Sequence, residues 1–256
     1  RAALPAFMAE HPDHPYSKVG LASIEASLAD LQRHCALQGL PLFRQERNHQ
    51  RLTPIGTLKS TWLSPETCAC VTEAPAPDVL LLATLEGFRD FHPALAAANL
   101  ATHSRFAHSR ILTGEIRLPQ LAAFSRNPHE FRSADIARLF DKQQHDKQDL
   151  LTDLAREIGR MVQECGEPGC RHIVLPACLS LGLVGPRLAE LEQRTGCTIK
   201  EVATMPPSLI GMRMQEALKR RFLALAGTFL TSERVLGARY AGDRVVGVHS
   251  QNADDQ

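Results

Sequence analysis

The chain has 256 residues, enough for one large domain or two modest ones, each with its own hydrophobic core. Hydrophobic residues make up 44% of it and charged residues 22%, which is typical of a folded globular protein and excludes a largely disordered one. Its 29 basic and 28 acidic residues leave a net charge of +1, so we expect no long-range field that would capture nucleic acid or an anionic membrane.

Hydropathy and cysteine spacing exclude two further classes. No run of about eighteen apolar residues occurs, so no transmembrane helix is expected. The seven scattered cysteines are typical of reduced cytosolic thiols, and neither Cys68-Ala-Cys70 nor Cys165-x4-Cys170 has the C-x-x-C spacing of a zinc site. We therefore predict no metal. Because the sequence begins with Arg1 and shows no signal peptide, we expect a piece of a longer protein.

The first predicted element is a helix over residues 18–38, with Ser17 as its N-cap and Gly39 at C′. Its apolar residues recur at helical spacing, at Leu21, Ile24, Leu28, Leu31 and Cys35. Residues 44–50 are predicted to form a polar turn. Residues 51–63 then form two short strands, broken at Thr53-Pro54 and Gly56.

After a proline-rich joint at 73–77, strands alternate with helices. Residues 79–85, VLLLATL, form a continuous apolar run, which predicts a strand buried on both faces. The further strands are expected at 106–117, 172–177 and 197–203. The intervening helices are expected at 90–103, from Pro119, from an N-cap at Ser133, at 147–165 and at 186–195. This alternation predicts an α/β fold with a mostly parallel sheet and flanking helices.

The last section changes character again. Ser208 is the expected N-cap of a helix that runs to about Ala226 and ends at Gly227. Short β segments follow at 229–232, 234–240 and 244–250. Ala241-Gly242-Asp243 has the composition of a hairpin turn between the last two.

Common catalytic fingerprints are missing from the sequence. It contains no G-x-G-x-x-G, no G-x-x-x-x-G-K-[ST], no H-E-x-x-H and no G-x-S-x-G. Gly237 and Gly242 have the spacing of a P-loop, but Asp243 stands where such a loop needs Lys. No Ser-His-Asp set can be assembled from the eleven histidines.

Three clusters of polar and cationic residues remain as candidate sites. The first is His49, Arg51, Thr53, Lys59 and Thr61; the second is Arg126, His129, Arg132 and Arg138; the third is Ser208 with Arg213. Hydroxyls and cations together suit a small polar anion, which Arg can bind through two hydrogen bonds. The free N–H groups of the helix that starts after Ser208 favour an anion as well.

Each cluster also has a structural interpretation. The first is compatible with a half-solvated strand, the second with long cationic side chains covering a helix surface, and the third with an ordinary helix start. Trp62, the only tryptophan, is expected to pack at a domain joint and not to bind a ligand.

Five long segments closely resemble the B subunit of anaerobic glycerol-3-phosphate dehydrogenase. They occur in that family's order and span nearly the whole chain: 14-HPYSKVG-20, 50-QRLTPIGTLKSTWLS-64, 130-EFRSADIARLFD-141, 175-LPACLSLG-182 and 204-TMPPSLIGMRMQEALKRRF-222. Members of this family resemble flavoproteins of the fumarate-reductase-like class. They begin with a Gly-rich nucleotide-binding unit and end with a further flavin-contacting segment, and this chain has neither.

The resemblance implies a domain organisation. Residues 1–48 would be a helical segment next to the missing nucleotide-binding unit, and residues 49–205 the α/β substrate or cap domain of the flavoprotein. Residues 206–256 would be a helix and β-hairpin that return to the nucleotide domain.

The resemblance also implies an activity. The family oxidises sn-glycerol 3-phosphate to dihydroxyacetone phosphate, with hydride transfer from C2 to a flavin and electrons passed towards membrane quinone. The implied cofactor is FMN, with FAD as the alternative. The implied partners are a flavoprotein A subunit and an iron–sulfur C subunit that docks at the membrane, which would place this chain in the cytoplasm, peripheral to the inner membrane, without direct insertion.

For the site, we expect Arg51, Thr53, Lys59, Thr61, Ser208 and Arg213 to bind the substrate's anion, and His49 to be the candidate catalytic base. Two alternatives stay open. The chain could be a non-catalytic α/β interaction subunit that supports assembly or electron relay with the A and C subunits. It could also be a free-standing α/β protein that binds a small phosphorylated molecule.

Overall fold

The computed structural model describes residues 3–71, 75–124, 131–142, 150–167, 169–231 and 233–252. Arg126 and His129 of the second cluster lie outside these residues. Backbone contacts divide the chain into two units, residues 1–218 and residues 219–256, and each is described by itself.

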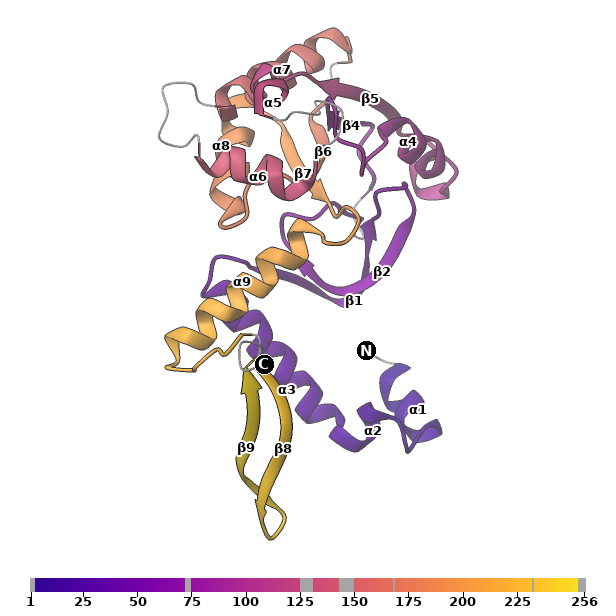
Figure 1. The fold of residues 1–256 in the computed structure, drawn as a ribbon. Helices are drawn as coiled ribbons and strands as arrows, with labels where there is room; N and C mark the ends of the chain where they lie inside the picture. Colours follow the sequence, from indigo (N-terminus) through magenta and orange to yellow (C-terminus); the bar gives the residue numbers. More distant parts are fainter. Residues whose placement is uncertain are drawn as a thin grey trace. The chain divides into compact units, whose positions relative to one another are not determined.

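The centre of the first unit is a four-stranded sheet in the order β5-β4-β6-β7 (Figure 1). Its strands are β4 (Val79–Leu85), β5 (Arg110–Ile116), β6 (His172–Pro176) and β7 (Thr198–Val202), and all neighbours are parallel. Every residue of β4 is buried, as its continuous apolar run predicts for a strand covered on both faces. The predicted α/β fold with a mostly parallel sheet is confirmed.

Helices cover both faces of this sheet. In Figure 1, α4 (Pro93–Ala101) lies on one side, and α7 (Leu150–Glu164) with α8 (Val184–Thr195) on the other. Three further helices complete the described connections: η1 (Ser104–Phe106), α5 (Pro119–Phe124) and α6 (Ser133–Lys142). α7 lies close to β5 at Gly114, where an added Cβ would lie 1.9 Å from the Met161 Cε atom and would displace the flexible end of that side chain.

A second, antiparallel sheet has the order β2-β1-β3, with β1 at Leu42–Leu52, β2 at Leu58–Pro65 and β3 at Cys70–Val71. The expectation of a polar turn at 44–50 is wrong, because these residues form most of β1 and keep their polar side chains largely exposed on a solvated sheet. The turn comes later, where the Gly56 N–H donates to the Thr53 carbonyl. Gly56 has φ of 82°, and a Cβ there would lie 2.0 Å from the Ala96 carbonyl oxygen of α4.

The N-terminal helices are α1 (Ala3–Glu10), α2 (Pro15–Val19) and α3 (Leu21–Ala36). The predicted single helix is interrupted at Gly20, which has φ of 85° and ψ of 147°. Ser17 therefore does not cap it; its hydroxyl donates to the His11 carbonyl at 2.6 Å. Gly39 is confirmed at C′, since its N–H donates to Ala36 and the Leu40 N–H to Cys35, the pattern of a Schellman motif.

Two predicted N-caps have different outcomes. The Ser208 hydroxyl accepts the Gly211 N–H at 3.2 Å and caps α9 (Leu209–Ala224), as expected. Ser133 is instead the first residue of α6, and its buried hydroxyl lies 3.0 Å from the Thr204 hydroxyl rather than capping its own helix.

The second unit holds the end of α9 and an antiparallel hairpin of β8 (Glu233–Ala241) and β9 (Arg244–Asn252), as predicted. Residues 229–231 form no strand, contrary to expectation. The left-handed residue that follows α9 is Ala226, with φ of 60°, one position before the predicted Gly227, whose N–H donates to the Phe222 carbonyl. In the hairpin register, one face carries Val235, Ala238, Tyr240, Val245 and Val248, and the other Arg234, Arg239, Arg244 and His249.

Candidate anion site on the three-stranded sheet

The antiparallel sheet brings four predicted site residues together. In its register, His49 pairs with Thr61 and Arg51 with Lys59, and Arg51 also faces Cys70 of β3. Residues directly opposite each other in an antiparallel pair carry their side chains on the same face. The face defined by these residues, called here the β1 face, is therefore crossed by two cations next to an imidazole.

The β1 face places two cations directly opposite each other. Like charges placed directly opposite each other destabilise a sheet, yet neither Arg51 nor Lys59 forms an ion pair with a carboxylate in the part of the chain that the structure describes. The Arg51 Nε atom is buried there without a hydrogen-bond partner. Lys200 of β7 adds a third cation near Cys70 and donates to the Glu66 carbonyl at 3.2 Å. This excess of positive charge suits an anion.

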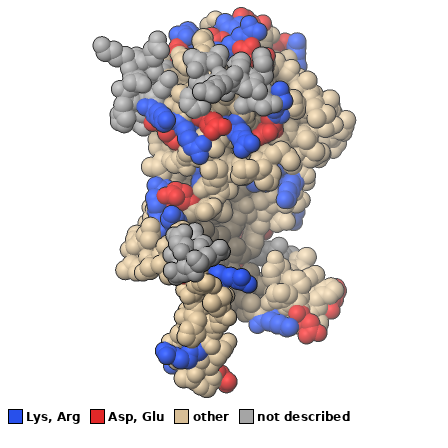
Figure 2. All heavy atoms as spheres, in the orientation of Figure 1, with Lys and Arg blue, Asp and Glu red and all other residues tan. Residues whose placement is uncertain are grey.

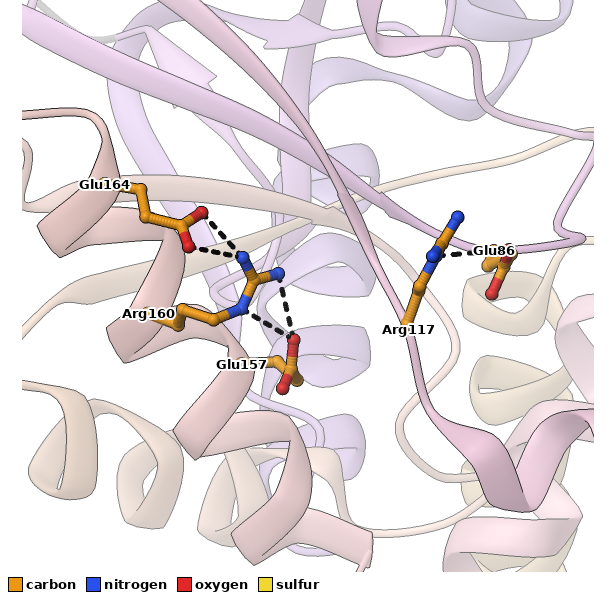
Figure 3. Close-up of polar contacts among 5 residues, drawn as sticks. All are labelled: Glu86, Arg117, Glu157, Arg160 and Glu164. Carbon is orange, nitrogen blue, oxygen red and sulfur yellow. Dashed lines mark hydrogen bonds and ion pairs between the residues drawn. The ribbon is translucent and has the colours of Figure 1, made fainter.

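Several cations of the first unit outside the β1 face form ion pairs. On α7, Arg160 forms ion pairs with Glu157 and Glu164. Away from that helix, Arg117 pairs with Glu86 (Figure 3). Figure 2 likewise shows basic and acidic side chains interspersed on one face of the molecule. The unpaired charges of the β1 face therefore depart from the pattern of the helical surface.

His49 is the buried centre of this arrangement, with 2% of its surface exposed. Its Nε2 atom lies 2.6 Å from the Ser64 hydroxyl, which in turn lies 3.4 Å from the Cys70 Sγ atom. Its Nδ1 atom is buried without a partner among the described residues. Burial lowers the pKa of His49, and the nearby Arg51 charge lowers it further, so the ring is neutral near pH 7 and can accept a proton.

A hollow of about 450 Å³ lies beside His49. It is bordered by Arg47, Asn48 and His49 of β1 and by His103 and Arg105 at η1. Its lining, in the part of the chain that the structure describes, includes no Asp or Glu. No local pattern in the sequence shows that Arg47, His103, Arg105 or Ser64 come close to His49.

The predicted hydroxyls serve the hairpin itself. The Thr53 hydroxyl lies 2.8 Å from the Thr57 hydroxyl and accepts the Thr57 N–H, while the Thr61 hydroxyl donates to the Lys59 carbonyl. The turn is fixed from outside by Asn99 of α4, whose amide donates to the Ile55 carbonyl at 2.7 Å. These contacts make the hairpin a rigid support for the β1 face.

Ser208 and Arg213 do not join the β1 face. The Ser208 hydroxyl is occupied by its own helix. Arg213, 3% exposed, donates from Nη1 and Nη2 to the two carboxylate oxygens of Glu201 at 2.6 and 3.0 Å, and from Nε to the Ser180 carbonyl at 2.7 Å. Each guanidinium nitrogen thus has a protein partner, which fits a structural role. Glu201 sits in a strand and carried no signal in the sequence.

The remaining predicted residues lie on surfaces. Arg138 pairs with Asp135 one turn before it on α6, and Arg132 is exposed just before that helix. The Trp62 indole N–H donates to the Gln45 carbonyl at 3.2 Å, and the Arg44 guanidinium lies 5.8 Å from the centre of its ring. Trp62 therefore packs within its own sheet.

The described residues supply neither a metal site nor a dinucleotide cradle. No group of three or more His, Cys, Asp or Glu side chains in the described ranges could hold a metal ion. A flavin dinucleotide needs a glycine-rich turn that opens onto a helix N-terminus, and the sequence has no such motif. The residues present therefore do not fit the pyrophosphate. Among the described helices, none is both long and apolar enough to cross a membrane.

Comparison with known proteins gives the family. The chain matches the family model "FAD binding domain" over residues 2–255, which favours FAD over the FMN expected first. It is 36% identical over 256 residues to the B subunit of anaerobic glycerol-3-phosphate dehydrogenase from Vibrio cholerae serotype O1 (strain ATCC 39315 / El Tor Inaba N16961), covering 99% of this chain and 56% of that protein. The proteins of the same name from Vibrio vulnificus (strain YJ016) and Pasteurella multocida (strain Pm70) are 38% and 34% identical, with 99% and 93% of this chain and 56% and 54% of theirs covered.

The chain thus spans a little over half the length of these relatives. No solved structure shows significant similarity to it. The expectation drawn from the five sequence segments is confirmed: the chain belongs to the FAD binding domain family and is a partial-length homologue of the anaerobic glycerol-3-phosphate dehydrogenase B subunit.

Proposed function

We propose that this chain is the substrate-domain portion of a flavin-linked glycerol-3-phosphate dehydrogenase subunit. The protein as a whole would oxidise sn-glycerol 3-phosphate to dihydroxyacetone phosphate, and the family match and the names of the relatives support this. Residues 1–48 would adjoin the nucleotide-binding part, residues 49–205 would form the substrate domain, and residues 206–256 would return to the nucleotide-binding part. FAD is the flavin that the family description supports.

The relatives are named as one subunit of an enzyme, which supports assembly with other chains. We propose a flavoprotein A subunit and an iron–sulfur C subunit as the partners, with the C subunit docked at the inner membrane and this chain on its cytoplasmic side. Electrons would leave through these partners towards quinone.

The observation that carries the proposal is a neutral, buried His49 beside unpaired cations. Oxidation of a secondary alcohol requires a base for the hydroxyl proton, and a histidine with a lowered pKa is available as one at pH 7. Arg51 and Lys59 supply positive charge without an acid to neutralise it, which suits the phosphate of the substrate or a polar edge of the flavin.

Within this proposal His49 accepts the proton of the substrate's C2 hydroxyl at Nδ1, the nitrogen without a protein partner among the described residues. Ser64 is a positioning residue, because its hydroxyl holds the other ring nitrogen at 2.6 Å and so fixes the orientation of the imidazole. Burial, helped by the Arg51 charge, lowers the pKa of His49 and keeps the ring unprotonated before substrate arrives. Thr53 and Thr61 act through the rigid hairpin, and we leave Ser208 and Arg213 out of the site.

The proposal is tested by titrating sn-glycerol 3-phosphate into the full chain at pH 6 in two buffers of different ionisation enthalpy. An anion bound beside His49 raises its pKa, so binding should take up protons and the measured heat should depend on the buffer. Because a phosphomonoester itself titrates at about pH 6, the contribution of His49 is the difference between variants: proton uptake should be smaller in His49→Gln and unchanged in His108→Gln, where the substituted histidine is exposed outside the site.

Two results would count against the proposal. Binding without proton uptake would remove His49 from the site. No binding by a folded chain would favour the alternative, a non-catalytic α/β subunit that supports assembly or electron relay.

A further inference from the structure

The hollow beside His49 has the lining of a phosphate site. Among the described residues, Arg47, His103 and Arg105 border it together with His49, and no Asp or Glu does. Its volume of about 450 Å³ lies within the range usual for small-molecule pockets. Because β1 is irregular between Arg44 and His49, its register with β2 is interrupted there, and Gln45, Arg47 and Asn48 border the hollow from one side.

Two of these side chains have donors to offer. Arg47 forms no ion pair with any described carboxylate, including Glu25 and Glu46, with which it borders a separate depression. The His103 Nδ1 atom accepts the Arg105 N–H at 3.3 Å, so in the neutral ring the proton must be on Nε2, which makes that nitrogen a donor. Arg105 adds positive charge at the same wall.

The Nδ1 atom of His49 is a further feature of this region. His49 borders the hollow and is 2% exposed, and its Nδ1 atom is buried with no partner among the described residues. A buried polar atom left without a partner is costly, and a ligand that reached this nitrogen from the hollow would remove that cost. His49 and the cationic residues thus border one cavity. A small molecule that carries an alcohol and a phosphate on neighbouring carbons could place the alcohol at His49 and the phosphate at the cationic residues.

We propose that this hollow is the phosphate subsite, that Arg47 and His103 bind the phosphomonoester of a triose-sized polyol, and that the C2 hydroxyl then lies at His49. This rests on the proposed function and refines it, because it assigns the substrate's phosphate to the wall formed by Arg47 and His103 and not to Arg51 and Lys59. The β1 face is then left for another anionic group.

The test titrates inorganic phosphate, sn-glycerol 3-phosphate, glycerol and flavin mononucleotide into the full chain. Loss of a hydrogen bond to a charged group weakens binding by about tenfold or more. Arg47→Gln and His103→Gln should therefore each weaken the binding of inorganic phosphate and of sn-glycerol 3-phosphate by that factor. Glycerol should not bind measurably. Arg44→Gln is the matched control, since Arg44 lies on the same strand but packs over Trp62 outside the hollow.

Lys59→Gln separates this inference from the proposed function. If Lys59→Gln weakens sn-glycerol 3-phosphate tenfold while Arg47→Gln leaves it unchanged, the phosphate lies on the β1 face; the inference is then wrong and the proposed function stands. If flavin mononucleotide binds more tightly than sn-glycerol 3-phosphate and depends on Arg47, the site takes a flavin phosphate and the triose-sized ligand is wrong. If none of the phosphate compounds binds to the folded chain, both proposals fail.

Discussion

Replacing Arg213 by Met should destabilise the chain severely without touching the β1 face. The substitution removes all three hydrogen bonds of the guanidinium and leaves the Glu201 carboxylate, 1% exposed, without its counter-charge. Breaking a buried ion pair by deleting one partner costs about 3–5 kcal/mol, a large share of the roughly 5–15 kcal/mol that keeps a typical domain folded. The Ser180 carbonyl loses its donor as well, which places the expected cost towards the upper end.

The measurement is urea unfolding of the full chain at pH 7, followed by circular dichroism. The matched control is Arg160→Met on α7, whose exposed ion pairs with Glu157 and Glu164 should be worth little (Figure 3). The double variant Arg213→Met with Glu201→Leu removes both buried charges, so it should be much closer to the wild type than Arg213→Met alone.

The reasoning would be refuted if Arg213→Met lowered the free energy of unfolding by less than about 1 kcal/mol, the value expected of an exposed pair. It would also be refuted if the effects of the two substitutions were additive, because groups that contact each other should show a coupling energy. A stable Arg213→Met variant that no longer bound sn-glycerol 3-phosphate would return Arg213 to the site.

Three further predictions concern His49, the end of α9 and two buried cysteines. Because burial lowers the pKa of His49 in the folded chain, its contribution to stability is present above the unfolded pKa of about 6.5 and is lost as pH falls towards the folded value. The free energy of unfolding should therefore fall less steeply with decreasing pH in His49→Gln than in the unaltered chain. Equal slopes of the free energy of unfolding against pH in the two proteins would contradict this. Ala226→Gly should slow hydrogen exchange of the Gly227 amide, which bonds to the Phe222 carbonyl after α9, by about fivefold. The reason is that a non-glycine residue at positive φ costs about 1 kcal/mol or more. Faster exchange of this amide would contradict the prediction. Burial raises the pKa of Cys68 to about 12 and also raises that of Cys178, so iodoacetamide should modify neither thiol in the folded chain at pH 8 and both in urea, and rapid labelling of either before unfolding would be the contrary result.

The sequence predicted best those elements whose signal is local. The apolar run of β4 and the Ser208 cap depend on neighbouring residues alone, and both were predicted correctly. Residues 44–50 were misassigned because a strand on a solvated sheet can be polar throughout, which resembles a loop to any pattern based on hydrophobicity. The interruption of the first helix at Gly20 was missed because the apolar spacing continues on the far side of it.

The site was predictable only in part for the same reason. Arg51 and Lys59 come together through a short hairpin, so their proximity is implied by the chain itself. Ser64 reaches His49 only because β1 is irregular between Arg44 and His49. His103 comes from η1, beyond β4, and only the packing of that connection brings it near Arg47. Arg213 looked free in the sequence because its partner Glu201 lies on a different element.

The strand order of the parallel sheet has a consequence for how the chain is made. Leu80 of β4 pairs with Ile111 of β5, the next strand along the chain, but its other edge pairs with His172 of β6, several helices later. During synthesis, β4, α4 and β5 can associate early, while one hydrogen-bonding edge of the most apolar strand waits for β6 to emerge from the ribosome. Such an edge can pair with other chains, so yield should depend on synthesis temperature and chaperone supply more than the native stability suggests.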